Sequence, residues 1–367
     1  MKNDKTFYTP EMYARRQRQK METSRGRLMI ASCCSGHQLS SDIVERYNTF
    51  LYDAGSKEEV LYLKKIDRRF SDSETSVRLN EHVSGYDVFL VQSLYDPVSK
   101  RPVDQNYMAF LIAARTFREN GARHVTGVLP YLAYARQDKP TKFMREPTTA
   151  KLMADLSIST GMDRMISWHP HSDQLHGFYS ATPVNLMDPL ALFVEKFKKF
   201  RDKDDVIAVA PDAGASKFVI NFGQALRISS AIASKIRPEP EEVITRSIIG
   251  NFSGKKTAII LDDIISSGGT VYSLAEKLIQ EKGIEEIILG VSHNLCSDRA
   301  LEKLNYMHQN YNLTQLIVTD SIPQTNEFKK LPFIKIEGLA DTLSRTINRI
   351  HYNRSVSQVF YNELKKS

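Results

Sequence analysis

The chain lacks the features that mark secreted, disulfide-stabilised or membrane-spanning proteins. Its 367 residues include three cysteines, Cys33, Cys34 and Cys296, which form neither a disulfide framework nor a zinc-binding pattern. No apolar run approaches the roughly 20 residues that a membrane helix needs. Residues 1–27 are polar and basic without an apolar core, unlike a secretory signal. We therefore expect a protein of the reducing cytoplasm with no membrane partner.

Low-complexity tracts and a clear internal sequence repeat are also absent. Hydrophobic residues make up 41% of the chain and charged residues 25%, which is the composition of a soluble globular protein. A chain of this length suits two domains of ordinary size, each able to bury a core.

The net charge of +7 and the pI of about 9.1 allow two interpretations. A basic protein can bind nucleic acid, but the basic residues here are dispersed and no recognition motif with interleaved aromatic residues is present. A basic balance equally suits an enzyme that binds several phosphate groups. We favour the second interpretation and expect no nucleic-acid partner; salt-dependent binding to DNA or RNA would test the first.

The most informative stretch is residues 258–270. An apolar run typical of a buried strand is followed by Asp262 and Asp263, then by Ser-Ser-Gly-Gly-Thr and a helical pattern. Glycines let backbone N–H groups approach an anion, and the N-terminus of the following helix carries a positive partial charge. Two adjacent carboxylates can accept hydrogen bonds from vicinal hydroxyls, as on a ribose. An ordinary helix cap needs only one aspartate, so we interpret the stretch as a phosphate loop with a sugar clamp.

Strands and helices are expected to alternate along the chain, which predicts an α/β fold with mainly parallel sheets. The expected strands are 28–32, 60–63, 88–92, 124–129, 165–168, 206–210, 228–233, 258–261, 284–293, 316–319 and 333–336. The main expected helices are 40–54, 105–120, 146–159, 190–200, 271–278 and 339–352, with two more beginning after residue 215 and at residue 299.

Two polar stretches follow predicted strands, at the sheet edge where open α/β folds bind ligands. Residues 130–139 read P-Y-L-A-Y-A-R-Q-D-K, whose aromatic and cationic side chains suit a nucleotide triphosphate, unless they form a solvated surface loop. The second stretch holds His169, His171 and His176. No cysteine or second histidine cluster completes a zinc site, so we expect one histidine to contact a phosphate or, through water, Mg²⁺.

Two features of the second half place charge near the expected site. Asp212 follows the strand 206–210, where a carboxylate can hold Mg²⁺. Residues 236–242, I-R-P-E-P-E-E, are rich in proline and charge, which is typical of a mobile lid rather than a core segment.

The 258–270 stretch resembles the phosphoribosyl-diphosphate (PRPP) motif, which occurs in type I phosphoribosyltransferases and in ribose-phosphate pyrophosphokinases, also called PRPP synthetases. Taken together, the motifs resemble the pyrophosphokinase family from about residue 27 to 360. The motifs that carry the resemblance are R-F-S-D-S-E-T at 69–75, the 130–139 loop, A-P-D-A-G at 210–214, L-D-D-I-I-S-S-G-G-T at 261–270 and R-I-H-Y-N-R-S-V-S-Q-V-F at 349–360.

The resemblance implies two phosphoribosyltransferase-like α/β domains. The implied division is a basic extension at 1–26, an ATP-site domain at 27–187, a ribose 5-phosphate domain at 188–345, and a C-terminal helix at 346–367 that can pack on the first domain. The implied reaction transfers the β,γ-diphosphoryl group of ATP to the C1 hydroxyl of ribose 5-phosphate, giving PRPP and AMP. Such a transfer needs positioning and charge neutralisation, with Mg²⁺ as the cofactor. A dimer-based homo-oligomer is implied, with a hexamer as one option.

Carried over residue by residue, the resemblance also assigns roles to side chains. Phe70, Asp72 and Glu74 would contact adenine from a neighbouring subunit, and Arg136 and Gln137 would bind ATP. His171 and Asp212 would bind or orient Mg²⁺ and the triphosphate. Lys235 and Arg237 would close over the transferring group. The ribose 5-phosphate site would comprise Asp262 and Asp263 at the hydroxyls and Ser266, Ser267, Gly268, Gly269 and Thr270 at the phosphate.

Three departures from the family pattern bear on Mg²⁺ handling and allosteric control rather than on the fold. His169-Pro170-His171 stands where the family usually has Asp-Leu-His. Ser266 stands where the synthetases usually carry a third aspartate. The ATP loop holds an extra residue between Lys139 and Arg145.

Two other functions stay open from the sequence. A type I phosphoribosyltransferase would consume PRPP with the same loop, but it requires neither two domains nor the stretches at 70 and 130–139. A non-catalytic homologue would instead regulate true synthetases. Lys235, Arg237, Asp212 and the two loop aspartates favour an active enzyme, whereas His169 and Ser266 favour the homologue.

Overall fold

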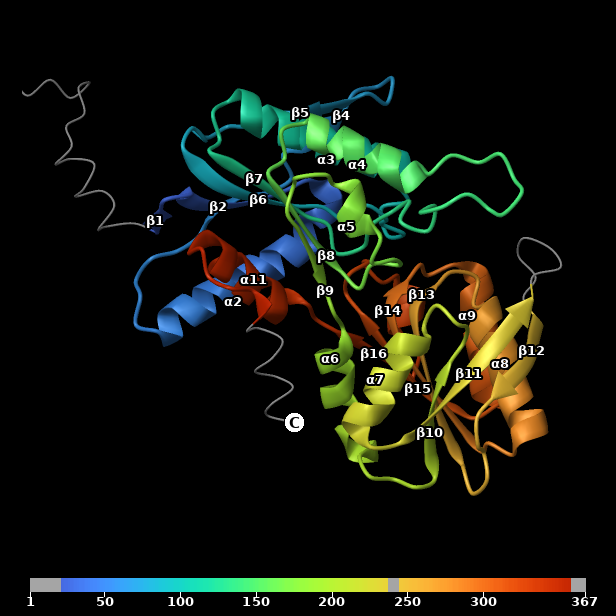
Figure 1. The fold of residues 1–367 in the computed structure, drawn as a ribbon. Helices are drawn as coiled ribbons and strands as arrows, with labels where there is room; N and C mark the ends of the chain where they lie inside the picture. Colours follow the sequence, from blue (N-terminus) through green and yellow to red (C-terminus); the bar gives the residue numbers. More distant parts are fainter. Residues whose placement is uncertain (1–20, 237–243, 358–367) are drawn as a thin grey trace, which may run out of the picture.

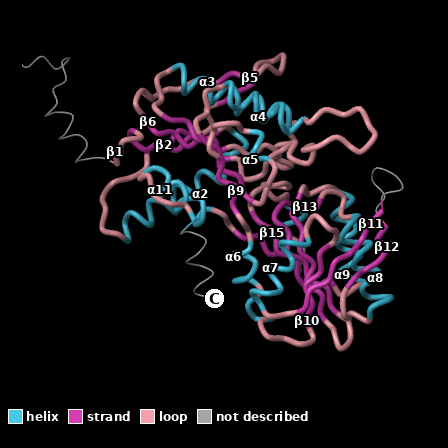
Figure 2. The backbone as a smooth tube through the Cα atoms, viewed as in Figure 1, coloured by secondary structure: helices cyan, strands magenta, loops and turns pink. Residues whose placement is uncertain are grey.

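The computed structural model describes residues 21–236 and 244–357. Figure 1 shows two α/β domains, the N-terminal one above and the second one below, each built around a sheet with helices against it. Figure 2 shows the strands of the second domain as an inner layer between helices. Each domain has a seven-stranded sheet, and most neighbouring strands are parallel. The predicted α/β class with mainly parallel sheets is confirmed.

The sheet of the N-terminal domain has the order β1-β2-β6-β7-β8-β9, with β3 also paired to β2. Only β1 runs antiparallel to its neighbour. The strands are β1 Glu22–Thr23, β2 Gly26–Ser32, β3 Leu61–Leu63, β6 Tyr86–Val91, β7 His124–Val128, β8 Arg164–Trp168 and β9 Val184–Met187; the helices are α2 His37–Asp53, α3 Val103–Glu119, α4 Thr149–Ser159 and α5 Leu175–Phe178.

Strand β6 shows why this sheet is covered on both faces. All six of its residues are buried, as a central parallel strand requires. Val88 and Leu90 belong to the cluster that contains Phe110 of α3. Phe89 and Val91, which alternate with them, belong to the cluster around α2.

The last described helix, α11 (Ala340–His351), returns to the N-terminal domain and packs against α2. Its apolar residues Leu343, Ile347 and Ile350 lie in the same cluster as the α2 face of the sheet. The Ser344 hydroxyl donates a 3.0 Å hydrogen bond to the Ile43 carbonyl of α2. Residues from both ends of the chain therefore share one core.

The second domain has the strand order β12-β11-β10-β13-β14-β15-β16, and only β12 is antiparallel to its neighbour. The strands are β10 Val206–Ala210, β11 Ser229–Ile236, β12 Ile244–Ile249, β13 Thr257–Ile265, β14 Glu286–Asn294, β15 Leu313–Thr319 and β16 Ile334–Glu337; the helices are α6 Leu190–Lys196, α7 Ser216–Leu226, α8 Gly269–Lys282, α9 Asp298–Asn310 and α10 Asn326–Lys329.

Three elements differ from the sequence expectation in ways that matter for the site. β13 continues to Ile265, so Asp262 and Asp263 lie in the strand rather than after it. β11 extends to Ile236 and pairs with β12, a strand that the sequence analysis missed. The backbone of Lys235 therefore lies in a strand, opposite Thr245. Arg237 lies outside the described residues, as does most of the segment interpreted as a lid.

The polar turn expected at 69–75 is the tip of a separate two-stranded sheet, formed by β4 (Asp67–Arg69) and β5 (Thr75–Val77). In Figure 1 this hairpin lies at the border of the N-terminal domain that faces away from the second domain. Along residues 21–236 and 244–357, we find no helix that is both long and apolar enough to cross a membrane.

Candidate active site

The candidate site lies at the carboxyl ends of three adjacent strands of the second domain. β13 pairs with β10 on one side and β14 on the other, all parallel. Asp212 follows β10, and Asp262 and Asp263 occupy the end of β13. Because the carboxyl ends of parallel strands share one sheet edge, the three predicted carboxylates are brought to the same edge.

The predicted phosphate loop joins β13 to helix α8. Gly268 caps α8 with φ of 72°, a left-handed conformation that favours glycine, and an added Cβ would lie 3.4 Å from the Ala300 Cα. The Ser297 hydroxyl donates a 2.6 Å hydrogen bond to the Ser266 carbonyl, which fixes the loop against the start of α9. The loop Ser266, Ser267, Gly268, Gly269 and Thr270 thus leads into a helix N-terminus, which attracts anions.

The N-terminal domain reaches this edge through the segment that follows β8. Nδ1 of His171 lies 2.6 Å from Oδ2 of Asp263, and the side chains are 42% and 18% exposed. The hydrogen bond to Asp263 raises the pKa of His171. Burial alone would raise the pKa of Asp263, but the bond and the positive charge of His171 hold it below its ordinary value. The two groups therefore form an ion pair that joins the domains.

His169 has the opposite environment two residues earlier. Its side chain is partly buried, its Nδ1 lies 2.6 Å from the Ser292 hydroxyl, and the loss of solvent around the ring lowers its pKa to about 3. His293 of β14 donates a 3.0 Å hydrogen bond from Nε2 to the His169 carbonyl. The backbone of His169 has φ of 39°, an uncommon conformation for a residue with a side chain. His169 therefore packs between the domains as a neutral ring, whereas His171 faces the site.

The predicted ATP loop lies beside the ion pair. The positive charge of Arg136 opposes the upward shift in the pKa of His171, so the two groups lie within electrostatic range. The Tyr131 ring packs edge-on against His293, with 5.1 Å between ring centroids. The Gln137 carbonyl accepts a 3.2 Å hydrogen bond from the Ala150 N–H, and the side chains of Arg136 and Gln137 are both exposed. Residues 131–137 therefore border the junction of the domains.

The structure does not bring every predicted residue to this junction. Phe70, Asp72 and Glu74 lie on the distant β4–β5 hairpin (Figure 1). Phe70 is 50% exposed, with the Arg68 guanidinium 5.5 Å from its ring centroid. Lys235 belongs to β11, and Arg237 is outside the described residues. Within one chain, the residues predicted to contact adenine are therefore separate from the predicted phosphate loop.

Sequence reasoning missed Ser292 and His293, which hold His169 at the junction. They lie inside a strand whose residues are almost all buried, and an isolated histidine in such a run carries no functional signal. Their contacts cross more than 120 residues of sequence. Only the spatial arrangement of the domains reveals them.

The donor set fits a metal that is held mainly by substrate. Within the described residues, no three His, Cys, Asp or Glu side chains converge as a metal site. Mg²⁺ typically takes one or two carboxylates from the protein and completes its coordination with substrate phosphates. The carboxylates at the ends of β10 and β13 can fill the protein's share. A histidine that bonds a carboxylate through one ring nitrogen is a common arrangement beside metals; His171 has it, but its other nitrogen would bind a metal only after losing the proton that Asp263 favours.

Comparisons with known proteins agree with this geometry. Residues 28–161 match the model of the N-terminal domain of ribose phosphate pyrophosphokinase. Residues 203–361 match the phosphoribosyl synthetase-associated domain. The chain also resembles a solved structure, the phosphoribosylpyrophosphate synthetase of Mycobacterium smegmatis, with a TM-score of 0.76 and 28% identity over 89% of this chain and 99% of that one.

Curated relatives extend over most of the chain. The ribose-phosphate pyrophosphokinase of Clostridium acetobutylicum is 36% identical over 296 residues, which is 80% of this chain and 88% of the relative. That of Caldanaerobacter subterraneus is 36% identical over 336 residues, or 91% and 98% of the two chains. At this identity and coverage, the chain belongs to the ribose-phosphate pyrophosphokinase family.

Proposed function

We propose that the protein transfers the β,γ-diphosphoryl group of ATP to the C1 hydroxyl of ribose 5-phosphate, giving PRPP and AMP. The observation that carries the proposal is the 2.6 Å contact between His171 and Asp263. It joins the side of the N-terminal domain that bears Arg136 to the strand end that precedes the phosphate loop. One site can thereby hold a nucleotide and a phosphorylated sugar together.

In the proposed reaction, the C1 oxygen attacks the β-phosphorus, the bond to the α-phosphate oxygen breaks, and the hydroxyl proton is released. AMP leaves with the α-phosphate. The protein's main task is to align the reactants and to neutralise charge. Asp262 and Asp263 would accept hydrogen bonds from the ribose hydroxyls, and the Ser266–Thr270 loop would hold the 5-phosphate through backbone N–H groups.

Cationic side chains would act on the triphosphate. Arg136 and Gln137 would bind ATP from the N-terminal domain, and Lys235 and Arg237 would neutralise the transferring group. His171 and Asp212 would hold or orient Mg²⁺. When bound, that ion supplies positive charge to the phosphate oxygens. The carboxylates of Asp212, Asp262 and Asp263 at one sheet edge support this assignment, because hard oxygen ligands suit Mg²⁺.

A second copy of the chain would complete the site. The tip with Phe70, Asp72 and Glu74 lies on the side of the N-terminal domain away from the ribose phosphate loop (Figure 1). Adenine contact from this hairpin therefore requires a neighbouring subunit, as a dimer-based homo-oligomer would provide. We further propose a cytoplasmic location, because Cys33, Cys34 and Cys296 are free thiols, which persist in reducing compartments.

Phosphorus NMR of the protein with ATP, ribose 5-phosphate and Mg²⁺ tests the reaction. PRPP and AMP should appear with the wild type and be strongly reduced with Lys235→Ala. The matched control is Lys256→Ala, since Lys256 precedes β13 and forms an exposed 3.4 Å ion pair with Glu285. This control should retain wild-type turnover.

Other products would overturn the assignment. ADP in place of AMP would mean that only the γ-phosphoryl group moves. No turnover despite bound ribose 5-phosphate would favour the non-catalytic homologue. Consumption of added PRPP with a nucleobase would instead establish a phosphoribosyltransferase.

A further inference from the structure

The β4–β5 hairpin needs an external support to hold its tip. Its strands pair over only three residues each, from Asp67 opposite Val77 to Arg69 opposite Thr75. A two-stranded hairpin of this kind is at best marginally stable by itself in water. Because Phe70 and its neighbours extend from the tip, the base of the hairpin must determine their position.

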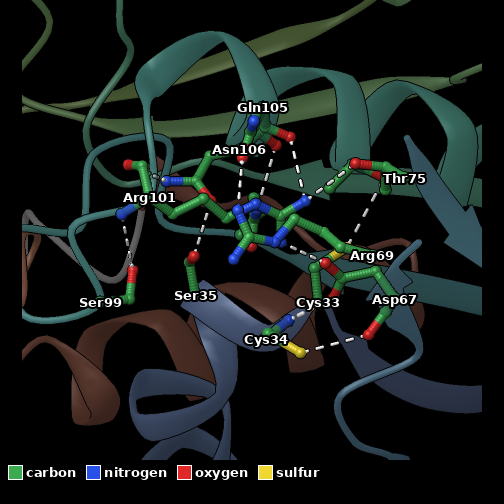
Figure 3. A network of polar contacts seen from close by, with 12 residues as sticks. Cys33, Cys34, Ser35, Asp67, Arg69, Thr75, Ser99, Arg101, Gln105 and Asn106 are labelled. Atoms are coloured by element: carbon green, nitrogen blue, oxygen red, sulfur yellow. Dashed lines mark hydrogen bonds and ion pairs between the residues drawn. The ribbon is translucent and has the colours of Figure 1, made fainter. Parts of the chain in front are cut away.

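Arg101 supplies that support from a different segment, the loop before helix α3. Figure 3 shows its guanidinium between the two strands and α3. One nitrogen, Nη1, forms an ion pair with the Asp67 carboxylate of β4. The other, Nη2, donates hydrogen bonds to the Thr75 hydroxyl of β5 at 3.1 Å and to the Gln105 carbonyl of α3 at 3.3 Å. A single side chain thus binds both strands and the helix.

The ion pair between Arg101 and Asp67 is buried, which makes it costly to break. The side chains of Arg101 and Asp67 are 9% and 0% exposed, so neither charge can be satisfied by bulk water if the other is removed. The planar guanidinium presents its donors in a rigid fork and can serve three acceptors at once. A lysine at this position would offer a single ammonium group and could not span the same acceptors.

Neighbouring contacts hold the same hairpin base. Arg69 donates a 3.2 Å hydrogen bond to the Gln105 side chain, and the Cys34 N–H donates to the Asp67 carboxylate at 2.5 Å (Figure 3). The Arg101 carbonyl accepts from the Asn106 side chain at 3.4 Å. These contacts join the hairpin to α3 and to the segment before α2, with the ion pair at their centre.

We propose that Arg101 is a positioning residue for the nucleotide: by holding the base of the β4–β5 hairpin, it sets where Phe70, Asp72 and Glu74 meet adenine. This inference rests on the proposed function, because it assumes that the hairpin contacts ATP. Arg101 itself touches no reacting atom. Its loss should therefore weaken ATP binding while the transfer step on the bound reactants stays intact.

Initial rates with varied ATP or varied ribose 5-phosphate test the proposal. Arg101→Ala should raise KM for ATP roughly tenfold, with kcat and KM for ribose 5-phosphate within about twofold of wild type, the pattern of lost uniform binding. Arg101→Lys should fall between alanine and wild type. The matched control is Arg115→Ala, since Arg115 lies on the adjoining helix α3 in an exposed ion pair with Glu119; it should behave as wild type.

An unchanged KM for ATP in Arg101→Ala would overturn the proposal. A fall in kcat together with equal rises in KM for ATP and KM for ribose 5-phosphate would also overturn it, because that pattern would indicate general damage to the fold. If circular dichroism shows that Arg101→Ala does not fold, the KM for ATP of a second variant, Thr75→Val, tests the proposal instead. This variant removes one hydroxyl and keeps the ion pair, and KM for ATP must then rise about two- to threefold for the proposal to stand.

Hydrogen exchange separates this proposal from the proposed function. If the wild type makes no PRPP, the proposed function fails while the hairpin contacts stay testable. Amides of residues 67–77 should then exchange at least about tenfold faster in Arg101→Ala than in wild type, with the 266–270 loop unchanged. Equal exchange at 67–77 in the two proteins would refute the role of Arg101.

Discussion

Two histidine–carboxylate pairs in this molecule have similar geometry and different surroundings. His171 and Asp263 approach to 2.6 Å at the junction of the domains, where both side chains are partly exposed. His351 of α11 and Asp87 of β6 approach to 2.9 Å inside the N-terminal domain, where both are fully buried. Asp87 also receives two 3.0 Å hydrogen bonds from Arg25. The first pair lies at the candidate site, and the second lies in the core.

The comparison shows that a short distance does not define a role. Asp87 has three hydrogen bonds, two from Arg25 and one from His351, and its side chain is fully buried. His351 uses its other nitrogen on the Met21 carbonyl at 3.2 Å, so the pair joins both ends of the chain to β6. Asp263 remains 18% exposed beside the predicted phosphate loop. We therefore expect the buried pair to determine stability and the exposed pair to determine turnover.

Asp87→Ala should give the largest effect. It leaves the buried His351 and the largely buried Arg25 without their carboxylate, and the loss of one partner of a buried pair typically lowers the free energy of unfolding by about 3–5 kcal/mol. Urea unfolding followed by circular dichroism measures the change. Activity per folded molecule should stay near wild type. A loss below about 1 kcal/mol would show that the buried pair is not the structural one of the two.

Asp263→Asn should reverse this pattern. If Asp263 holds the ribose hydroxyls as proposed, PRPP formation should fall about 100-fold, equivalent to roughly 2.7 kcal/mol, because the carboxylate charge is lost. The free energy of unfolding should change by no more than about 1 kcal/mol, as for other partly exposed pairs. Asp202→Asn, which removes an exposed partner of Arg227, is the matched control and should leave both quantities unchanged. Full activity in Asp263→Asn would end the distinction between the pairs.

The pH dependence of stability should identify the exposed pair. The pKa of His171 is raised in the folded state, so its stabilising effect is complete below the unfolded value near 6.5 and disappears as pH rises through the raised value. The pKa of Asp263 is lowered, so its effect is present above about 3.8 and disappears on acidification. Wild type should therefore exceed His171→Asn in stability most clearly near pH 5–6. The measurement is chemical unfolding at pH 5, 6 and 8, and a difference that grows toward pH 8 would contradict the assignment.

Arg46→Ala should have the smallest effect. Arg46 binds Asp341 at 2.6 Å, across α2 and α11, with side chains 41% and 39% exposed. Exposed pairs typically contribute about 0.2–1 kcal/mol, so the unfolding free energy should fall by less than that upper value. Thermal and urea unfolding should agree. A fall near that of Asp87→Ala would mean that this surface contact, rather than the buried His351, holds α11 in place.

Local patterns were sufficient to predict much of the fold. The run before Asp262 predicted a buried strand, and Ser-Ser-Gly-Gly-Thr predicted the turn into a helix, because both signals lie within a few residues. β12 was missed because Ile244–Ile249 follows a stretch of proline and glutamate that masked its weak strand pattern. β13 was predicted too short, since aspartates are uncommon inside strands.

The candidate site was predictable residue by residue but not as an arrangement. The motifs identified His171 and Asp263 separately, yet their contact spans 92 residues and depends on how two domains meet. The separation of the Phe70 hairpin from the loop at 266–270 likewise follows from the tertiary structure. The neutral state of His169 depends on its burial against the second domain, which no local pattern encodes.

The return of α11 to the first domain has a consequence for biosynthesis. Leu339, Leu343 and Ile350 belong to the same cluster as Leu28 and Phe89, so the α2 face of the first sheet lacks part of its cover until residues 340–351 have been synthesised. Domains usually fold in order as they emerge. Here the first domain must wait, with apolar surface exposed, for a helix that is translated after the strands of the second domain. Premature termination shortly before residue 340 would therefore damage the N-terminal domain more than the second domain, whose strands would all have been made.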